Sequence, residues 1–155
     1  MGKEVERKFL VKPGAWTPEG AGTWYKQGYL SSQKERVVRV RIAGTKSMLT
    51  IKGPTTGVTR SEFEYPIPLE DASILLDTLC EKPLIDKHRH LEVHGGKTWE
   101  IDVFHGENEG LVVAEIELTS EAEAFEHPAW LAEEVSSDPR YFNSNLLKNP
   151  FSTWK

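Results

Sequence analysis

Cysteine, long apolar runs and net positive charge are all scarce in this sequence of 155 residues. Cys80 is the single cysteine, which excludes an internal disulfide and any zinc site built from two or more thiolates. No apolar run approaches the roughly 18 residues that a membrane-spanning helix needs, so no membrane partner is expected. Nineteen Lys and Arg face 24 Asp and Glu, a net charge of −5, and nucleic-acid binding is not expected because it depends on phosphate neutralisation.

The length is that of one ordinary domain, which we expect to span residues 1–155. A chain of this size buries about 70% of the surface that its unfolded state exposes, so it can fold without disulfides or structural metals. The first residues, Met1-Gly-Lys-Glu-Val-Glu, are charged and lack the apolar core of a signal peptide. We therefore expect a cytoplasmic location.

Most of the chain alternates between apolar and polar residues with the period of two that is typical of strands. Turn signals rich in glycine and proline separate the alternating stretches. The expected strands are residues 3–12, 24–31, 35–43, 47–53, 59–67, 84–94, 97–105 and 111–119.

A helical pattern interrupts the strands between Glu70 and Cys80. Leu75, Leu76 and Leu79 recur there at helical spacing, and we expect them to face the core. Two further short helices are expected over residues 121–126, where Ser120 and Glu123 have the spacing of a capping box, and over residues 144–148.

Like charges at every second position mark six of the expected strands, so they share one face of each strand. Two arrangements are open: a sheet or barrel with this face in solvent, or a wide barrel in which it lines a tunnel. Same-sign neighbours repel unless a counter-ion lies between them, which favours the tunnel. The charged face comprises Glu4, Glu6, Glu62, Glu64, Glu100, Asp102, Glu115 and Glu117 with Lys8, Arg39, Arg41, Lys52, Lys87 and Arg89.

If the charged face lines a tunnel, its side chains indicate which ligands would bind there. Eight crowded carboxylates cannot all ionise without cations, and oxygen ligands without a cysteine or histidine cluster favour Mg2+, Mn2+ or Ca2+ over zinc. Lys and Arg side chains in the same space suit phosphate oxygens. A phosphate chain bound together with divalent metal ions would satisfy both sets.

The segment Glu4-Val-Glu6-Arg-Lys8 resembles the E-x-E-x-K signature of the CYTH superfamily, the triphosphate tunnel metalloenzymes. The chain is most similar to the small bacterial inorganic triphosphatases of that superfamily. Further similar segments follow in the family's order: Arg39-Val-Arg41, Lys52 in Thr-Ile-Lys-Gly, Glu62-Phe-Glu64, Lys87-His-Arg89, Glu100-Ile-Asp102, Glu115-Ile-Glu117 and Tyr141-Phe-Asn143.

The resemblance implies an α+β, mainly β fold: an eight-stranded antiparallel β-barrel that forms a tunnel, with a few flanking helices. It implies phosphate binding by Lys8, Arg39, Arg41, Lys52, Lys87 and Arg89. It implies two Mg2+ or Mn2+ ions held by Glu4, Glu6, Glu62, Glu64, Asp102, Glu115 and Glu117. The residues expected to be catalytic are Glu4, Glu6, Lys8, Tyr29 and Lys87.

The implied activity is metal-dependent hydrolysis of a small-molecule triphosphate, with inorganic tripolyphosphate, cleaved to pyrophosphate and phosphate, as the first choice. The alternatives are a class IV-type adenylate cyclase, a thiamine or nucleoside triphosphatase, and a non-catalytic polyphosphate-binding module. The sequence does not determine the natural substrate, the preferred metal or the carboxylate that positions water. It also leaves a homodimer open.

Two other motifs have simpler interpretations. Gly95-Gly-Lys-Thr98 resembles the end of a P-loop, but the first glycine of that motif would fall on Leu91, so we expect a hairpin turn between two strands. His88, His90 and His94 alternate opposite to the charged face, so we expect them to point outward and not to form a zinc site.

Overall fold

A computed structural model of the chain describes residues 2–154. Within these residues the strands are β1 (Lys3–Val11), β2 (Thr23–Gln33), β3 (Arg36–Ala43), β4 (Lys46–Lys52), β5 (Thr59–Pro66), β6 (Ile85–His94), β7 (Lys97–Phe104), β8 (Val112–Leu118) and β9 (Leu131–Glu134). The helices are α1 (Leu69–Thr78) and α2 (Asn143–Leu146), with short 3-10 turns η1 (Gly106–Asn108), η2 (Pro139–Tyr141) and η3 (Phe151–Thr153). No helix in this part of the chain has the length and apolar character needed to span a bilayer.

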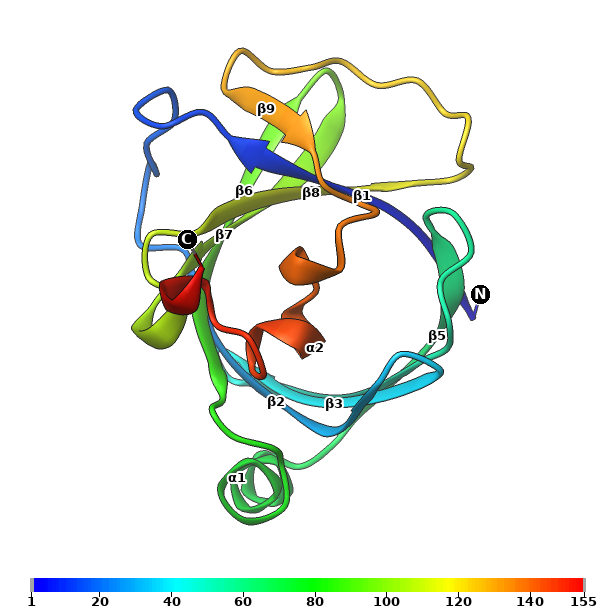
Figure 1. The fold of residues 1–155 in the computed structure, drawn as a ribbon, viewed down its shortest axis with the longest axis vertical. Helices are drawn as coiled ribbons and strands as arrows, with labels where there is room; N and C mark the ends of the chain where they lie inside the picture. Colours follow the sequence, from blue (N-terminus) through cyan, green and yellow to red (C-terminus); the bar gives the residue numbers. More distant parts are fainter. Residues whose placement is uncertain (1, 155) are drawn as a thin grey trace.

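Eight strands form a closed antiparallel barrel, which confirms the expected fold class (Figure 1). Their order is β5-β4-β3-β2-β6-β7-β8-β1, and pairing of β1 with β5 closes the ring. Glu4 lies opposite Arg60 at this closure. The expected strand bounds agree with the observed ones to within about two residues, because glycine-containing turns end most of the alternating stretches. The ninth strand, β9, pairs with β1 outside the ring and was not predicted.

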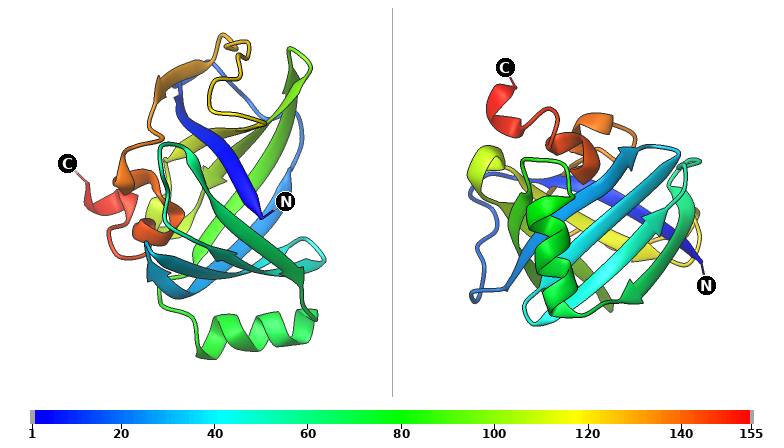
Figure 2. Two further views of the ribbon diagram at one scale, coloured as in Figure 1. Left: turned by 90° about the vertical axis from the view of Figure 1, so that its right-hand side faces the viewer. Right: turned by 90° about the horizontal axis from the view of Figure 1, so that it is seen from below.

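The outer, apolar face of the barrel is covered by α1 and by the segment that follows β8 (Figure 2). α1 packs Ala72 and Leu76 on Val40 of β3, and Cys80 completes this cluster. The close approach depends on Gly28 of β2, since a Cβ there would lie 2.8 Å from the Cβ of Cys80. The barrel thus stacks an apolar layer outside its strands and leaves the opposite strand face to line the interior.

Leu79 was expected in the core, and that prediction was wrong: 65% of it is exposed. α1 ends at Thr78, so Leu79 is already the C-cap residue and has left the helical repeat that places Leu76 against the barrel. Helical spacing predicts a buried face only as far as the helix continues.

The helix expected over residues 121–126 is also absent from the described chain. Glu123 accepts hydrogen bonds from the backbone N–H and the hydroxyl of Thr119, and it forms an ion pair with Lys97 on the β6–β7 hairpin. These contacts hold residues 120–123 as a single turn. Phe125 then packs on Phe9 of β1 instead of continuing a helix. The other short helix, expected over 144–148, is present as α2.

Candidate active site

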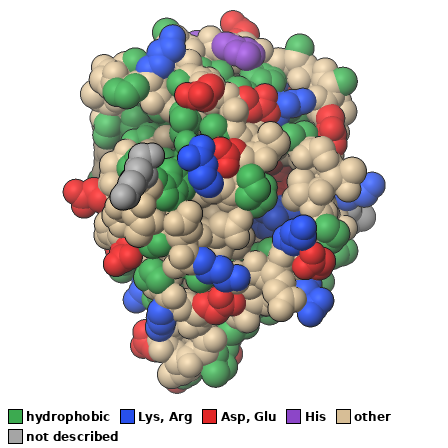
Figure 3. Space-filling view, in the orientation of Figure 1, with side chains coloured by type: hydrophobic (Ala, Val, Ile, Leu, Met, Phe, Trp, Pro, Cys, Tyr) green, Lys and Arg blue, Asp and Glu red, His purple; other side chains and the backbone are tan. Residues whose placement is uncertain are grey.

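The interior of the barrel is a charged cavity of about 230 Å³, which we call the barrel cavity (Figure 3). Alternation along the strands directs its side chains inward, while apolar neighbours such as Val40 and Ile116 face outward and are buried against the covering segments. The charged face is therefore internal. The cavity is lined by Glu4, Glu6, Lys8, Tyr29, Val37, Arg39, Arg41, Lys52, Thr55, Val58, Arg60, Glu62, Glu64, Lys87, Arg89, Glu100, Glu115, Glu117, Ser136, Phe142, Asn143 and Ser144.

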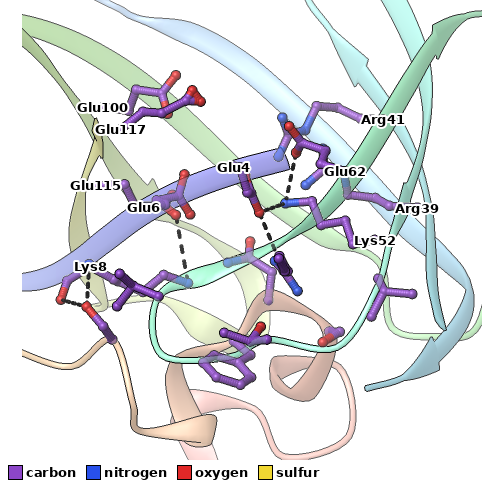
Figure 4. A pocket seen from close by; sticks show the side chains of 18 of the residues that line it. Glu4, Glu6, Lys8, Arg39, Arg41, Lys52, Glu62, Glu100, Glu115 and Glu117 are labelled. Atoms are coloured by element: carbon purple, nitrogen blue, oxygen red, sulfur yellow. Dashed lines mark hydrogen bonds and ion pairs between the residues drawn. The ribbon is translucent and has the colours of Figure 1, made fainter. Parts of the chain in front are cut away.

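Glu4 anchors a group of ion pairs where β1, β4 and β5 meet (Figure 4). Its carboxylate lies 3.1 Å from Lys52 Nζ and 2.8 Å from Arg60 Nε, and Lys52 also lies 3.3 Å from Glu62. Burial alone would raise the pKa of Glu4, but Lys52 and Arg60 outweigh it and lower this pKa to about 2. Glu4 is thus a permanently ionised group at this side of the cavity.

Three carboxylates from three adjacent strands converge at another wall of the cavity. Oxygen atoms of Glu6, Glu100 and Glu115 all lie within 4.8 Å of one another. Burial and the neighbouring Glu115 raise the pKa of Glu6 well above its ordinary value. Glu115 stays ionised, because Lys8 and Arg89 lower its pKa in spite of burial. Such crowded oxygen donors fit a hard divalent cation, which would relieve the repulsion that raises the pKa of Glu6.

The wall formed by β2, β3 and β6 has excess positive charge. Arg39 Nε is buried without a hydrogen-bond acceptor among residues 2–154, and no carboxylate of that range lies within 4 Å of Arg41. Burial, together with repulsion from Arg39 and Arg89, lowers the pKa of Arg41 to about 10. Both Arg41 and Arg89 also stack on the ring of Tyr25. A guanidinium donor without an acceptor, as in Arg39, and a guanidinium without a carboxylate partner, as in Arg41, both suit phosphate oxygens.

Asp102, which was predicted to be a metal ligand, lies behind the cavity wall and not in the cavity lining. It is almost fully buried and does not belong to the described residues that line the cavity. One of its oxygens accepts from Lys87 at 2.7 Å, and both accept from Arg89 at 2.7 and 2.9 Å. Burial would raise its pKa, but these two cations lower it. Glu100, two residues earlier on the same face of β7, is the residue that joins the carboxylate cluster.

Lys87 lies at the inner end of this wall. In addition to its ion pair with Asp102, its ammonium donates to Asn143 Oδ1 at 2.9 Å. Complete burial lowers the pKa of Lys87 to about 7, although Asp102 opposes the shift. Arg89 and Arg41 add to the lowering. The ammonium therefore loses its proton more easily than an ordinary lysine does.

The segment after β9 covers one end of the barrel, where α2 lies across the opening of the ring of strands (Figures 1 and 2). Leu146 and Tyr141 pack there on inward-facing apolar residues, including Val37 and Val113. Lys8 Nζ donates to the Tyr141 carbonyl at 3.0 Å. This C-terminal segment, residues 135–154, thus closes part of one end of the cavity and holds Lys8.

Several lining residues were not predicted from the sequence. Arg60 could have been found, because it continues the alternation of Glu62 and Glu64 along β5. Ser136 and Asn143 come from the C-terminal segment, where no strand alternation indicates a direction. For Asn143 the only available signal was its place in Tyr141-Phe-Asn143. All other predicted site residues besides Asp102 line the cavity.

The two motifs with simpler interpretations lie outside the cavity, as expected. Gly95 and Gly96 form the β6–β7 turn with positive φ angles of 60° and 77°. On β6, His88 and His90 alternate with the inward-facing Lys87 and Arg89. His88 contacts His105, with their ring nitrogens 2.8 Å apart.

Comparisons with known proteins agree with this geometry. A family model described as the CYTH domain matches residues 2–147. The chain is 50% identical to an inorganic triphosphatase of Acetivibrio thermocellus over 155 aligned residues. The alignment covers 100% of this chain and 99% of that protein. An inorganic triphosphatase of Nitrosomonas europaea is 36% identical over 149 residues, 92% of this chain and 95% of that one. A crystal structure of an inorganic triphosphatase is similar with a TM-score of 0.65 at 34% identity, covering 93% of each chain.

Proposed function

Since the chain belongs to the CYTH family, we propose that it is a metal-dependent triphosphatase that hydrolyses inorganic tripolyphosphate to pyrophosphate and phosphate in the barrel cavity. The observation that supports this most is the division of the cavity into a wall of incompletely satisfied guanidinium groups and a cluster of three carboxylates. A polyanion and its divalent counter-ions need both.

The phosphate chain lies along the cationic wall. The proposed ligands of its oxygens are Lys8, Arg39, Arg41, Lys52, Lys87 and Arg89, which all line the cavity. Arg39 and Arg41 contribute most, because Arg39 Nε has no acceptor within residues 2–154 and no carboxylate of that range lies within 4 Å of Arg41. Lys52 contributes less, since Glu4 and Glu62 already neutralise it.

Two Mg2+ or Mn2+ ions are the proposed cofactors. Glu6, Glu100 and Glu115 would hold one ion, and the remaining carboxylates, Glu4, Glu62, Glu64 and Glu117, are the proposed ligands of the other. When bound, such ions neutralise phosphate oxygens and lower the pKa of a coordinated water. Asp102 has a different proposed role, which is to orient Lys87 and Arg89 toward the substrate.

The chain's own groups supply charge stabilisation and proton transfer. Lys8, held 3.9 Å from Glu115 and by the Tyr141 carbonyl, is placed to stabilise negative charge on the phosphate that leaves. Glu6, whose pKa is raised, is the proposed acceptor of the proton from the attacking water, and the ionised Glu4 is proposed to orient that water. Lys87 and the Tyr29 hydroxyl are the proposed proton or hydrogen-bond donors on the opposite side of the phosphate chain.

The test is release of orthophosphate from tripolyphosphate by the purified protein with Mg2+ or Mn2+. We expect turnover that excess EDTA abolishes, and a large loss of turnover in Lys8→Ala with the fold retained by circular dichroism. Turnover in EDTA would contradict the metal assignment, and full activity of Lys8→Ala would contradict the site. Tight binding without turnover would indicate a binding module, and cyclic AMP from ATP would indicate a cyclase.

A further inference from the structure

Two neutral amide side chains lie among the cations at the end of the barrel cavity that the C-terminal segment closes. Gln27 is fully buried on β2, and Asn143 is the first residue of α2. Gln27 Nε2 donates to Asn143 Oδ1 at 3.1 Å. Arg41 contacts Gln27, and Lys87 contacts Asn143, so the amide pair bridges two of the proposed phosphate ligands.

The two cations determine how each amide is oriented. Arg41 Nε donates to Gln27 Oε1 at 2.8 Å, and because a guanidinium has no acceptor, Gln27 must turn its oxygen toward Arg41. Gln27 therefore presents its NH2 group to Asn143. Asn143 must therefore turn its oxygen toward Gln27, and Lys87 Nζ donates to the same oxygen at 2.9 Å. Asn143 consequently uses its oxygen for both of these contacts.

This orientation leaves the NH2 group of Asn143 available. It has no hydrogen-bond partner within residues 2–154, and Asn143 lines the cavity. Gln27 Nε2 also donates to Tyr29 Oη at 3.2 Å, so the hydroxyl proton of Tyr29 is free to donate as well. The network thus leaves two neutral donors at the closed end of the cavity, and the oxygens of a bound phosphate can accept from both.

We propose that Asn143 is a phosphate-binding residue, whose amide NH2 donates to an oxygen of the phosphate nearest the C-terminal segment. This inference rests on the proposed function, and it makes the C-terminal segment part of the substrate site instead of a passive cover. A neutral donor adds a hydrogen bond to phosphate without adding repulsion to Arg41, Lys87 and Arg89, which already crowd this wall.

Equilibrium binding separates a direct contact from an effect through Lys87. We would titrate tripolyphosphate into metal-free protein in EDTA by calorimetry, using wild type, Asn143→Ala, Lys87→Ala and the double variant. Asn143→Ala is expected to weaken binding about tenfold, both in the wild type and in the Lys87→Ala background, because Gln27 still orients Asn143 in the Lys87→Ala single variant. If the second loss is missing, Asn143 acts only through Lys87 and the proposal fails.

Asn145→Ala is the matched control on the same short helix. Asn145 donates to the Pro139 carbonyl at 2.9 Å and does not belong to the described cavity lining, so its loss perturbs the segment without removing a phosphate contact. We expect wild-type affinity for this variant. An equal loss in Asn145→Ala and Asn143→Ala would show that only the integrity of the segment matters, and would overturn the proposal.

Asn143→Asp gives a second, independent test. Aspartate preserves both acceptor contacts, to Lys87 and Gln27, but replaces the free NH2 by a carboxylate oxygen. A positioning role predicts near wild-type binding, whereas a phosphate contact predicts weaker binding than in Asn143→Ala. Ser144→Asp adds the same charge one residue along the cavity lining and measures general repulsion, so equal losses in these two aspartate variants would contradict a directed contact.

The outcomes also separate this inference from the proposed function. Wild-type protein that binds tripolyphosphate while both residue 143 variants bind equally well disproves the role of Asn143 and leaves the triphosphatase assignment intact. Wild-type protein that neither binds tripolyphosphate in EDTA nor releases phosphate from it with Mg2+ or Mn2+ disproves both.

Discussion

The two ends of the barrel interior share one strand pattern but differ in chemistry. Along β3 the inward positions run from Val37 to Arg39 and Arg41, and along β6 they run from Ile85 to Lys87 and Arg89. The apolar positions pack against the C-terminal segment, where Val37 also borders the cavity, while the charged ones line the cavity. Alternation alone therefore determines which side a residue faces, and its distance along the strand determines whether it serves packing or ligand binding.

This difference also separates where stability and function reside. At the apolar end, Leu146 and Val113 are buried in one apolar cluster, as in an ordinary core. In the charged part, Arg41 and the carboxylate cluster keep like charges together, which costs folding free energy unless a ligand compensates. Substitutions in the charged part should thus lower activity or ligand binding, whereas substitutions at the apolar end should lower the free energy of unfolding.

The largest effect is expected for Glu115→Gln in the charged part. Because Glu115 is the ionised member of the carboxylate cluster, its loss should lower metal-dependent phosphate release by about a hundredfold or more. Glu133→Gln, on the exposed edge strand β9, is the control and should retain wild-type rates. Comparable rates for the two variants would show that the cluster is not the metal site.

A core substitution at the apolar end should instead act on folding. Leu146→Ala leaves a cavity in a fully buried position, so the free energy of unfolding in urea should fall by about 2–5 kcal/mol. Leu79→Ala, at a residue that is mostly exposed, should change it by less than about 0.5 kcal/mol. Equal losses would contradict the assignment of Leu146 to the packed end and of Leu79 to the surface.

Metal binding should release protons and strengthen as the pH rises. Burial and Glu115 raise the pKa of Glu6, so this carboxyl retains a proton at pH values where an exposed glutamate has lost it. A metal ion must displace that proton, and affinity for Mn2+ should increase by up to about tenfold per pH unit below the raised pKa. Calorimetry in two buffers of different ionisation enthalpy measures the release; pH-independent affinity would oppose this account.

The smallest expected effect is a gain in stability. Arg41→Met removes a buried charge that pairs with no carboxylate within residues 2–154. The free energy of unfolding of the ligand-free protein should therefore rise by about 1 kcal/mol. The same variant should lose tripolyphosphate binding. Arg7→Met is the comparison, because Arg7 pairs with Glu134 at 2.8 Å outside the barrel. This variant should lower the free energy of unfolding by up to about 1 kcal/mol. Destabilisation by Arg41→Met would mean that its charge is compensated without ligand.

The strands and the direction of most site residues could be predicted because both depend on a period of two. Arg39 and Glu64, for example, face the cavity as their alternation requires. Depth within the barrel could not be predicted in this way. Asp102 and Glu100 share a face, yet one is sealed behind Lys87 and the other reaches the carboxylate cluster.

Features that depend on tertiary contacts were not predicted, because the local sequence pattern carries no signal for them. Residues 131–134, Leu-Ala-Glu-Glu, have no strand-like sequence and become β9 only because β1 offers a free edge there. Glu123 has the local spacing of a capping box, but its carboxylate forms an ion pair with Lys97 on the β6–β7 hairpin, which is distant in the sequence. Asn143 reaches the cavity only through the path of the C-terminal segment.

A crystal structure of the protein with tripolyphosphate and Mn2+ tests the central claim most directly. We predict phosphate density inside the barrel against Arg39 and Arg41, and an anomalous manganese peak among Glu6, Glu100 and Glu115. Phosphate and manganese bound on the outer surface, with the barrel interior holding only water, would contradict the assignment of the charged interior as the active site.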